Sequence, residues 1–513
     1  MKRIKYLYTG AIAATLLVSS CKKDFLETKP SENISPGQIA DASTQDPTLL
    51  KGAVSGLYST MYNTGTGGTT NHDDFGQKGY DIYGDMLASD MVLGAVTYGW
   101  YSGVVRYQST KDYTSNPAYQ PWRYYYRIIF AANNLIETLG GNDAVPANAT
   151  LKSYMGQAKG MRAYAYFYLA QFYADKGFGT GSEKILPLYT DTKGQSVPLS
   201  TSAQVYDQII KDLTAAIDLL NGYTRQNKSE VDVNVAKGLL AYAYAARGTN
   251  EDLAKVVTLT DDVLAVYPLT TKNAVAAQFD ASGALTNPES GFNTVSTPSW
   301  IWGVDLTLAA ELDLISWWGQ IDIYTYSYAW AGDPKYIDAG LYDSIHSDDI
   351  RKTQFFNNKP PYTDEHGDYG GLVPQGKFFN SARVEGGQRN VTDDYIYMRA
   401  DEMQLLNAEA KARLGQDADA KTSLKKLLAL RQTNSSYVDA LTGNALKEEI
   451  YLQTRIELWG EGKVYLAMKR NKHSVTRGAN HLFNAGETFS YDADELTFPI
   501  PQAEVINNAN LYK

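Results

Sequence analysis

The residues from 317 to 330 form the densest group of side chains that could hold a ligand. Within this group Tyr324, Tyr326 and Tyr328 alternate with small residues, so in an extended segment their rings project from one face. A sugar offers an apolar C–H face that stacks on flat rings, and hydroxyls that bond to amides, carboxylates or guanidinium groups. The pattern predicts a stacking platform for a linear glycan, made of Trp317, Trp318, Tyr324, Tyr326, Tyr328 and Trp330. The alternative is an edge strand whose aromatic face is buried.

The sequence around each tryptophan decides how that residue is interpreted. Trp317 and Trp318 stand between a serine and a glycine, and this setting favours exposure. A second candidate for ligand binding is the pair Trp100 and Tyr101, in the glycine- and tyrosine-rich loop from Gly94 to Gly103. The tryptophans expected in the core are Trp122, Trp300, Trp302 and Trp459.

The polar residues do not point to metal, cofactor or catalytic chemistry. The five histidines are scattered, without an HExxH pair or another ligand spacing, so no metal site and no cofactor is predicted. Asp364, Asp368 and Gly370 surround His366, but they lack the spacing of a calcium loop. The formal net charge is −10, and a phosphate backbone attracts the opposite sign, which argues against nucleic-acid binding. No catalytic residue is assigned.

The N-terminus has the pattern of a lipoprotein signal. A basic start precedes an apolar run from Ala11 to Val18, which is too short to span a bilayer. The only cysteine of the chain, Cys21, follows, so residues 1–20 are predicted to be a cleaved signal peptide and Cys21 the site of lipid attachment. An ordinary secretory signal with an incidental cysteine is the alternative. Acyl chains on Cys21 would anchor the protein without a transmembrane helix, and the polar residues 21–45 would form a tether.

A recurring pattern of small residues indicates how the chain folds. The pattern AKGxxAYAY occurs at 158–166 and again at 236–244, and such small residues let a neighbouring helix approach closely. Helices of this kind with amphipathic partners are typical of tetratricopeptide-like helix pairs. The helical periodicity fails after about residue 270, where prolines, glycines and short β-like runs are frequent. We expect a mainly α fold in one domain, 46–513, with a helical scaffold at 46–270 and 395–470 and a loop-rich, ligand-binding insert with short β-strands at about 271–394.

Further short motifs occur in a defined order along the chain. They are CKKDFL at 21–26, AANNLI at 131–136, QAKGMRA at 157–163, VYDQIIKDL at 205–213, YMRADEM at 397–403, RIELWGEG at 455–462 and FPIPQAE at 498–504. In this order and spacing, the chain resembles the SusD/RagB family of surface-exposed outer-membrane nutrient-binding lipoproteins of Bacteroidota. Lys463 and Ala467 depart from the Arg and Asp usual in the family, which puts a local ion pair in doubt. Glu457 and Glu461 lie in a motif that belongs to the scaffold of the family and are not interpreted as catalytic.

The resemblance implies a function as well as a fold. Such proteins bind oligosaccharides, or peptides in some members, and deliver them uncleaved to a SusC-like TonB-dependent transporter of the outer membrane. We therefore expect a non-catalytic glycan-binding lipoprotein of the cell surface that serves polysaccharide utilisation and nutrient uptake. A peptide-binding member of the same family is the first alternative. A secreted glycoside hydrolase is the second, because spacing alone does not exclude two carboxylates about 5–10 Å apart.

Overall fold

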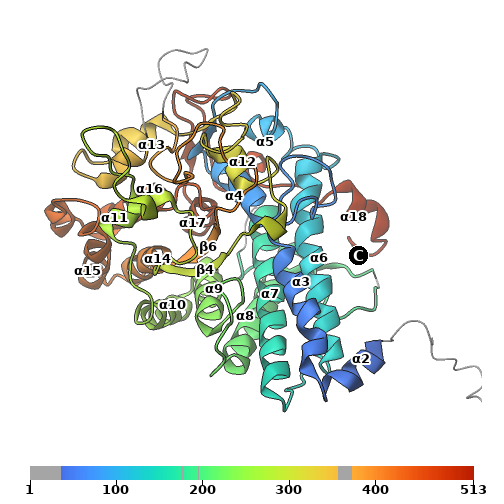
Figure 1. The fold of residues 1–513 in the computed structure, drawn as a ribbon. Helices are drawn as coiled ribbons and strands as arrows, with labels where there is room; N and C mark the ends of the chain where they lie inside the picture. Colours follow the sequence, from blue (N-terminus) through green and yellow to red (C-terminus); the bar gives the residue numbers. More distant parts are fainter. Residues whose placement is uncertain (1–35, 175–177, 195, 356–371) are drawn as a thin grey trace, which may run out of the picture. The chain divides into compact units, whose positions relative to one another are not determined.

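The computed structural model describes residues 36–174, 178–194, 196–355 and 372–513 (Figure 1). The predicted signal peptide, Cys21 and the residues around His366 lie outside these ranges. The chain divides into two units, Met1–Gly52 and Ala53–Lys513. In the first unit, the described part holds helix α2 (Pro36–Ser43) and the 3-10 turn η2 (Pro47–Leu50). Within the described ranges, no helix combines the length and the apolar character needed to cross a membrane.

The second unit is built on a row of helices that pack in sequence order. They are α6 (Asn116–Thr138), α7 (Ala149–Tyr173), α8 (Ser202–Leu219), α9 (Val233–Arg247), α10 (Asn250–Leu264), α14 (Ala400–Arg413), α15 (Asp417–Leu428) and α16 (Gly443–Glu457). Figure 1 shows α6 to α10 as neighbours, with α14 and α15 continuing the row. A capping box between Thr201 and Gln204 begins α8. The prediction of a mainly α scaffold of tetratricopeptide-like helix pairs is confirmed.

The repeated small residues let these helices approach one another. In the first copy, a Cβ on Gly160 of α7 would lie 3.0 Å from Cγ1 of Val231, before α9. In the second copy, a Cβ on Gly238 of α9 would overlap the sulfur of Met398. Both positions are tightly packed, and the tyrosines beside them, such as Tyr164 and Tyr242, are buried.

The elements outside the row are short. The helices are α3 (Lys51–Ser59), α4 (Gln77–Leu87), α5 (Ser102–Val105), α11 (Lys272–Val275), α12 (Trp317–Ile321), α13 (Ala339–Ser344), α17 (Val464–Asn471) and α18 (Gln502–Asn507). The 3-10 turns are η3 (Pro288–Gly291), η4 (Leu308–Ala310), η5 (Ile350–Gln354), η6 (Ser436–Ala440) and η7 (Asp494–Leu496). Six of these short elements, α11, α12, α13, η3, η4 and η5, lie between α10 and α14, where the sequence predicts a loop-rich insert.

The strands pair only in twos, in antiparallel sheets. β1 (Met91–Leu93) pairs with β5 (Lys335–Ile337), and β2 (Lys184–Pro187) pairs with β3 (Leu199–Thr201). β4 (Trp300–Val304) pairs with β6 (Tyr395–Arg399), and β7 (Val475–Thr476) pairs with β8 (Thr488–Phe489). The β1–β5 pair positions the candidate site, because it joins a loop from the N-terminal part of the chain to the insert.

A buried network of charged side chains joins the insert to the C-terminal helices. The carboxylate of Glu457 accepts hydrogen bonds from Arg399 at 2.8 Å, Arg431 at 2.8 Å and Arg351 at 3.0 Å, and all four side chains are fully buried. Burial alone would raise the pKa of Glu457, but the surrounding guanidinium groups hold it well below its ordinary value. Glu461 bonds to Arg399 in the same network. The motif RIELWGEG thus supplies scaffold ion pairs.

Candidate functional site

Two loops far apart in the sequence meet at one end of the β1–β5 sheet. One loop, 94–101, follows β1, and the other, 322–334, precedes β5. Because Leu93 pairs with Lys335, both loops leave the sheet at the same end. The carboxylate of Asp333 accepts hydrogen bonds from the backbone N–H groups of Thr97 and Tyr98, at 2.7 and 2.8 Å. This contact brings together the side chains that we name the aromatic surface: Tyr98, Trp100, Tyr326, Tyr328 and Trp330.

Tyr328, from the second loop, packs against the aromatic rings of the first loop. Its ring meets Tyr98 edge-on at a centroid distance of 5.0 Å and Trp100 at 6.3 Å. Its hydroxyl lies 2.5 Å from Nδ1 of His72, and the His72 ring stacks on Trp100 at 5.0 Å. Tyr328 itself is only 6% exposed, whereas Tyr98 is 50% exposed. Tyr328 therefore holds its neighbours in place, and Tyr98 and the half-buried Trp100 present their rings to solvent.

Tyr326 and Trp330 form the second half of the aromatic surface. They are 36% and 38% exposed, and their ring centroids lie 5.6 Å apart. The guanidinium of Arg389 lies 4.3 Å from the Tyr326 ring centroid, in a cation–π contact. Behind Trp330 the chain passes Gly386, where a Cβ would lie 2.7 Å from Cε2 of the indole. Glycine at that position lets the indole lie flat against the backbone with part of its surface still free.

A buried carboxylate shapes the turn that carries these rings. Asp322 accepts hydrogen bonds from the backbone N–H of Tyr324 at 3.0 Å and from the Thr325 hydroxyl at 2.9 Å. It also accepts one from the backbone N–H of Asn380 at 3.0 Å, which ties the turn to a neighbouring loop. Burial raises the pKa of Asp322 to about 7, and these hydrogen bonds act in the opposite direction. The hydrogen bonds of Asp322 thus stabilise the turn that carries these rings.

The predicted exposure of Trp317 and Trp318 is wrong. They are 1% and 0% exposed and begin α12. The Nζ of Lys78 from α4 lies 4.1 Å from the Trp317 ring centroid, and Trp318 Nε1 donates to the carbonyl of Asp393 at 2.8 Å; α4 and α12 are neighbours above the helix row in Figure 1. The flanking Gly319 marks a close approach, since a Cβ there would overlap the carbonyl oxygen of Leu314. These two tryptophans are core residues.

The three alternating tyrosines do not share a face, because residues 322–332 form turns and not an extended strand. Tyr324 is buried, and its hydroxyl accepts a hydrogen bond from Arg383 at 2.5 Å. Tyr101 is also buried, at a backbone φ of 66°, with the Nζ of Lys335 5.5 Å from its ring centroid. Of the predicted ligand-binding rings outside α12, the structure leaves Trp100, Tyr326 and Trp330 accessible, whereas Tyr101, Tyr324 and Tyr328 are buried.

The structure adds three residues to the site that the sequence did not single out, Tyr98, His72 and Arg389. Tyr98 lies two positions before Trp100, and its place in the aromatic loop was an available signal. No sequence signal marks His72 or Arg389, because only the tertiary fold brings His72 to Trp100 and Arg389 to Tyr326. As predicted, the side chains of Trp122, Trp300, Trp302 and Trp459 are buried.

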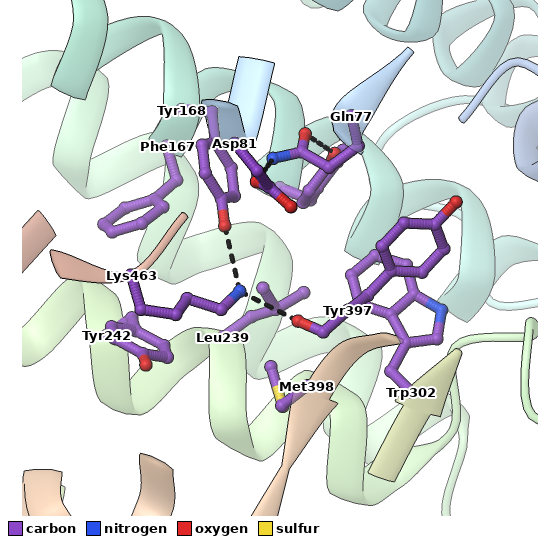
Figure 2. A pocket seen from close by; sticks show the side chains of 11 residues that line it. Gln77, Asp81, Phe167, Tyr168, Leu239, Tyr242, Trp302, Tyr397, Met398 and Lys463 are labelled. Carbon is purple, nitrogen blue, oxygen red and sulfur yellow. Dashed lines mark hydrogen bonds between the residues drawn. The ribbon is translucent and has the colours of Figure 1, made fainter. Parts of the chain in front are cut away.

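A small enclosed cavity lies inside the scaffold and is distinct from the aromatic surface. Figure 2 shows Lys463 pointing into it, with Nζ donating to the Tyr168 hydroxyl at 3.1 Å and to the Tyr397 carbonyl at 2.8 Å. The cavity holds about 10 Å³, room for about one water molecule and not for a sugar. Lys463 Nζ lies 3.9 Å from Oε2 of Glu402, so the lysine found here in place of the family's arginine still pairs with an acid.

Comparison with known proteins covers most of the chain in two parts. Residues 83–249 match a family described as starch-binding and associating with the outer membrane, and residues 322–513 match the SusD family. The curated SusD-like protein P25 of Formosa agariphila is 28% identical over 171 residues. That alignment spans 33% of this chain and only 31% of the relative.

Solved structures match over nearly the whole chain. A SusD-like carbohydrate-binding protein of Bacteroides vulgatus is 24% identical with a TM-score of 0.73, covering 91% of this chain and 97% of its own. Surface glycan-binding protein A of Bacteroides thetaiotaomicron, solved with laminarihexaose, is 16% identical with a TM-score of 0.64 and covers 91% of this chain and 98% of its own. At these identities the structural matches establish the fold, and together with the two family matches they lead to one assignment: the chain belongs to the SusD/RagB family.

Proposed function

We propose that this protein is a non-catalytic glycan-binding lipoprotein, and that the aromatic surface is where it holds the sugar chain. The observation that carries the proposal is that two distant loops meet, through the contacts of Tyr328 with Tyr98 and Trp100, and that Trp100, Tyr326 and Trp330 on these loops have rings accessible to solvent. Flat rings in this arrangement suit the apolar faces of successive sugar units. The binding of laminarihexaose by a protein of the same fold supports an oligosaccharide ligand.

Three acids in the loops around the aromatic surface are engaged in hydrogen bonds, which supports binding without cleavage. Hydrolysis requires two carboxylates that are free to act on one glycosidic bond. Asp333 is occupied by two backbone N–H groups, and Asp322 is buried and bonded to its own turn. Asp393 accepts hydrogen bonds from Asn380 at 2.9 Å and Gln388 at 3.0 Å. These carboxylates stabilise the loops that carry the rings, through the hydrogen bonds that they accept.

The proposed cellular role follows from the family and from the N-terminus. A lipid on Cys21 would hold the protein at the outer membrane, and residues 22–45 would give it reach. There it would pass the captured oligosaccharide to a SusC-like TonB-dependent transporter. The description of the matched family as associating with the outer membrane supports this location.

Calorimetric titration of the full-length protein with plant, microbial and host oligosaccharides tests the proposal, with a reducing-end assay run on each polysaccharide. We expect micromolar binding of at least one glycan and no new reducing ends. Release of reducing sugar would contradict the non-catalytic role. If no glycan in the panel binds, the glycan proposal fails and the peptide-binding alternative replaces it.

A further inference from the structure

A pocket of about 310 Å³ lies between α6, the segment that follows β2, and α18, and it shares no residue with the aromatic surface. Tyr126 and Phe130 come from α6, and their spacing of four residues places them on one helical face. Tyr189 comes from the segment after β2, and Glu504 and Asn507 come from α18. The pocket therefore has aromatic walls and a polar rim.

Hydrogen bonds between these elements build the pocket in advance of any ligand. Asn133, which is 1% exposed, donates from Nδ2 to the carbonyls of Tyr189 at 3.1 Å and Asp191 at 3.2 Å. On the other side, Asn508 donates to Oε1 of Glu504 at 2.8 Å and to the Tyr189 hydroxyl at 3.4 Å. Both asparagines are buried, so the three parts of the wall are tied to one another through polar side chains with little freedom.

The chemistry of the lining matches a small polyhydroxylated ligand. Phe130 is 57% exposed and offers an open apolar face. The carboxylates of Asp191 and Glu504 and the amide of Asn507 can accept from or donate to hydroxyls. Among the described lining residues the only charged groups are the carboxylates of Asp191 and Glu504, and Asp191 lies 3.4 Å from the exposed Nζ of Lys193, so the lining favours a neutral ligand over an anionic one. The volume lies at the lower end of the range for small-molecule pockets, about 300–1,000 Å³.

We propose that this pocket binds one or two rings of a neutral sugar, independently of the aromatic surface. The apolar face of the ring would lie against Phe130, and its hydroxyls would reach the rim formed by Asp191, Glu504 and Asn507. The site goes beyond the proposed function, because it would hold a short sugar even where the long glycan is bound elsewhere on the protein.

Saturation-transfer NMR on the full-length protein tests the site, with methyl hexosides, neutral disaccharides and glucuronic acid as ligands. We expect transfer to the ring C–H protons of at least one neutral sugar, and weaker transfer to glucuronic acid. Phe130→Ala should reduce the transfer at least fivefold. Ile506→Ala is the matched control, because Ile506 is 70% exposed on α18 and does not line the pocket, and Trp330→Ala tests independence from the aromatic surface.

Both controls should keep the wild-type signal, and thermal melts should confirm that each variant is folded. The proposal is overturned if no neutral sugar gives transfer, or if the signal survives Phe130→Ala. It is also overturned if the signal disappears in Trp330→Ala, because the sugar would then occupy the aromatic surface. If Trp330→Ala loses the binding of long glycans but keeps the signal of the short sugar, the result bears on the proposed function and not on this pocket.

Discussion

The imidazole of His72 lies parallel to the indole of Trp100, with centroids 5.0 Å apart and planes 6° from parallel. The same histidine meets the Tyr328 hydroxyl at 2.5 Å. His72 thus supports both Trp100, which would touch the glycan, and Tyr328, whose ring packs against Tyr98 and Trp100.

Replacing His72 with alanine should weaken glycan binding severalfold, because Trp100 and Tyr328 lose the contact that fixes their orientation. The stacking contact contributes about 0.5–1.5 kcal/mol. Titration calorimetry measures the affinity. His346→Ala is the control, since His346 stacks on Tyr437 at 4.7 Å, outside the aromatic surface, and its removal should leave binding unchanged. Equal affinity for wild type and His72→Ala would show that Trp100 does not take part.

Gly386→Ala should also reduce affinity, through Trp330. Alanine at this position, with φ at +59°, would cost about 1 kcal/mol of backbone strain and would push its Cβ into the indole. Gly415→Ala is a matched control, because φ is +75° there and nothing lies within 4 Å of the added Cβ. Both variants should lose similar backbone stability, but only Gly386→Ala should lose binding. A similar loss of binding in both variants would argue against a role for Trp330.

Glu457→Gln should destabilise the fold by about 3–5 kcal/mol, because it leaves Arg351, Arg399 and Arg431 buried without full compensation. Urea unfolding measures the free energy. The control is Asp439→Asn, which breaks the exposed pair with Lys425 at 2.8 Å and should cost at most about 1 kcal/mol. If the two substitutions cost the same, the buried network does not stabilise the scaffold as described.

The free energy of unfolding should depend on pH through Asp322. Burial raises its pKa to about 7, above the ordinary value of 3.8, so between these pH values the folded state holds a proton that the unfolded state has lost. The stability contributed by this proton is fully present below pH 3.8 and is lost as the pH rises through 7. In Asp322→Asn the group no longer titrates.

The difference in unfolding free energy, wild type minus Asp322→Asn, should therefore fall by a few kcal/mol between pH 4 and pH 8, as followed by urea titration at each pH. Asp393 and Asp394, whose pKa values burial raises to about 6, are present in both proteins and cancel. A difference that is constant with pH, or one that rises, would contradict the raised pKa.

The helical scaffold was predictable because its signals are local. The capping box at Thr201, the spacing of the small residues around Gly160 and Gly238, and the periodicity of α8 all lie within one helix or one turn.

The site was predictable only in part, because burial is decided by contacts between distant segments. Trp317 is covered by Lys78 and Phe378, and Tyr324 is covered by Arg383. These contacts come from distant segments, so the residues next to Trp317 and Tyr324 in the sequence do not predict their burial. The pairing of Leu93 with Lys335, which brings Trp100 to Tyr328, likewise has no local signal. The sequence shows that both loops are rich in aromatic residues, but it does not show that the two loops come together in the fold.

The most direct test of the account is calorimetric titration of the double variant Tyr326→Ala, Trp330→Ala with the glycan that binds wild type best. Each lost stacking contact should cost about 1 kcal/mol, so affinity should fall at least tenfold while the melting temperature stays near that of wild type. Tyr113→Ala, which removes a 44% exposed ring outside the aromatic surface, should bind as wild type does. Wild-type affinity in the folded double variant would contradict the central claim that this surface holds the sugar.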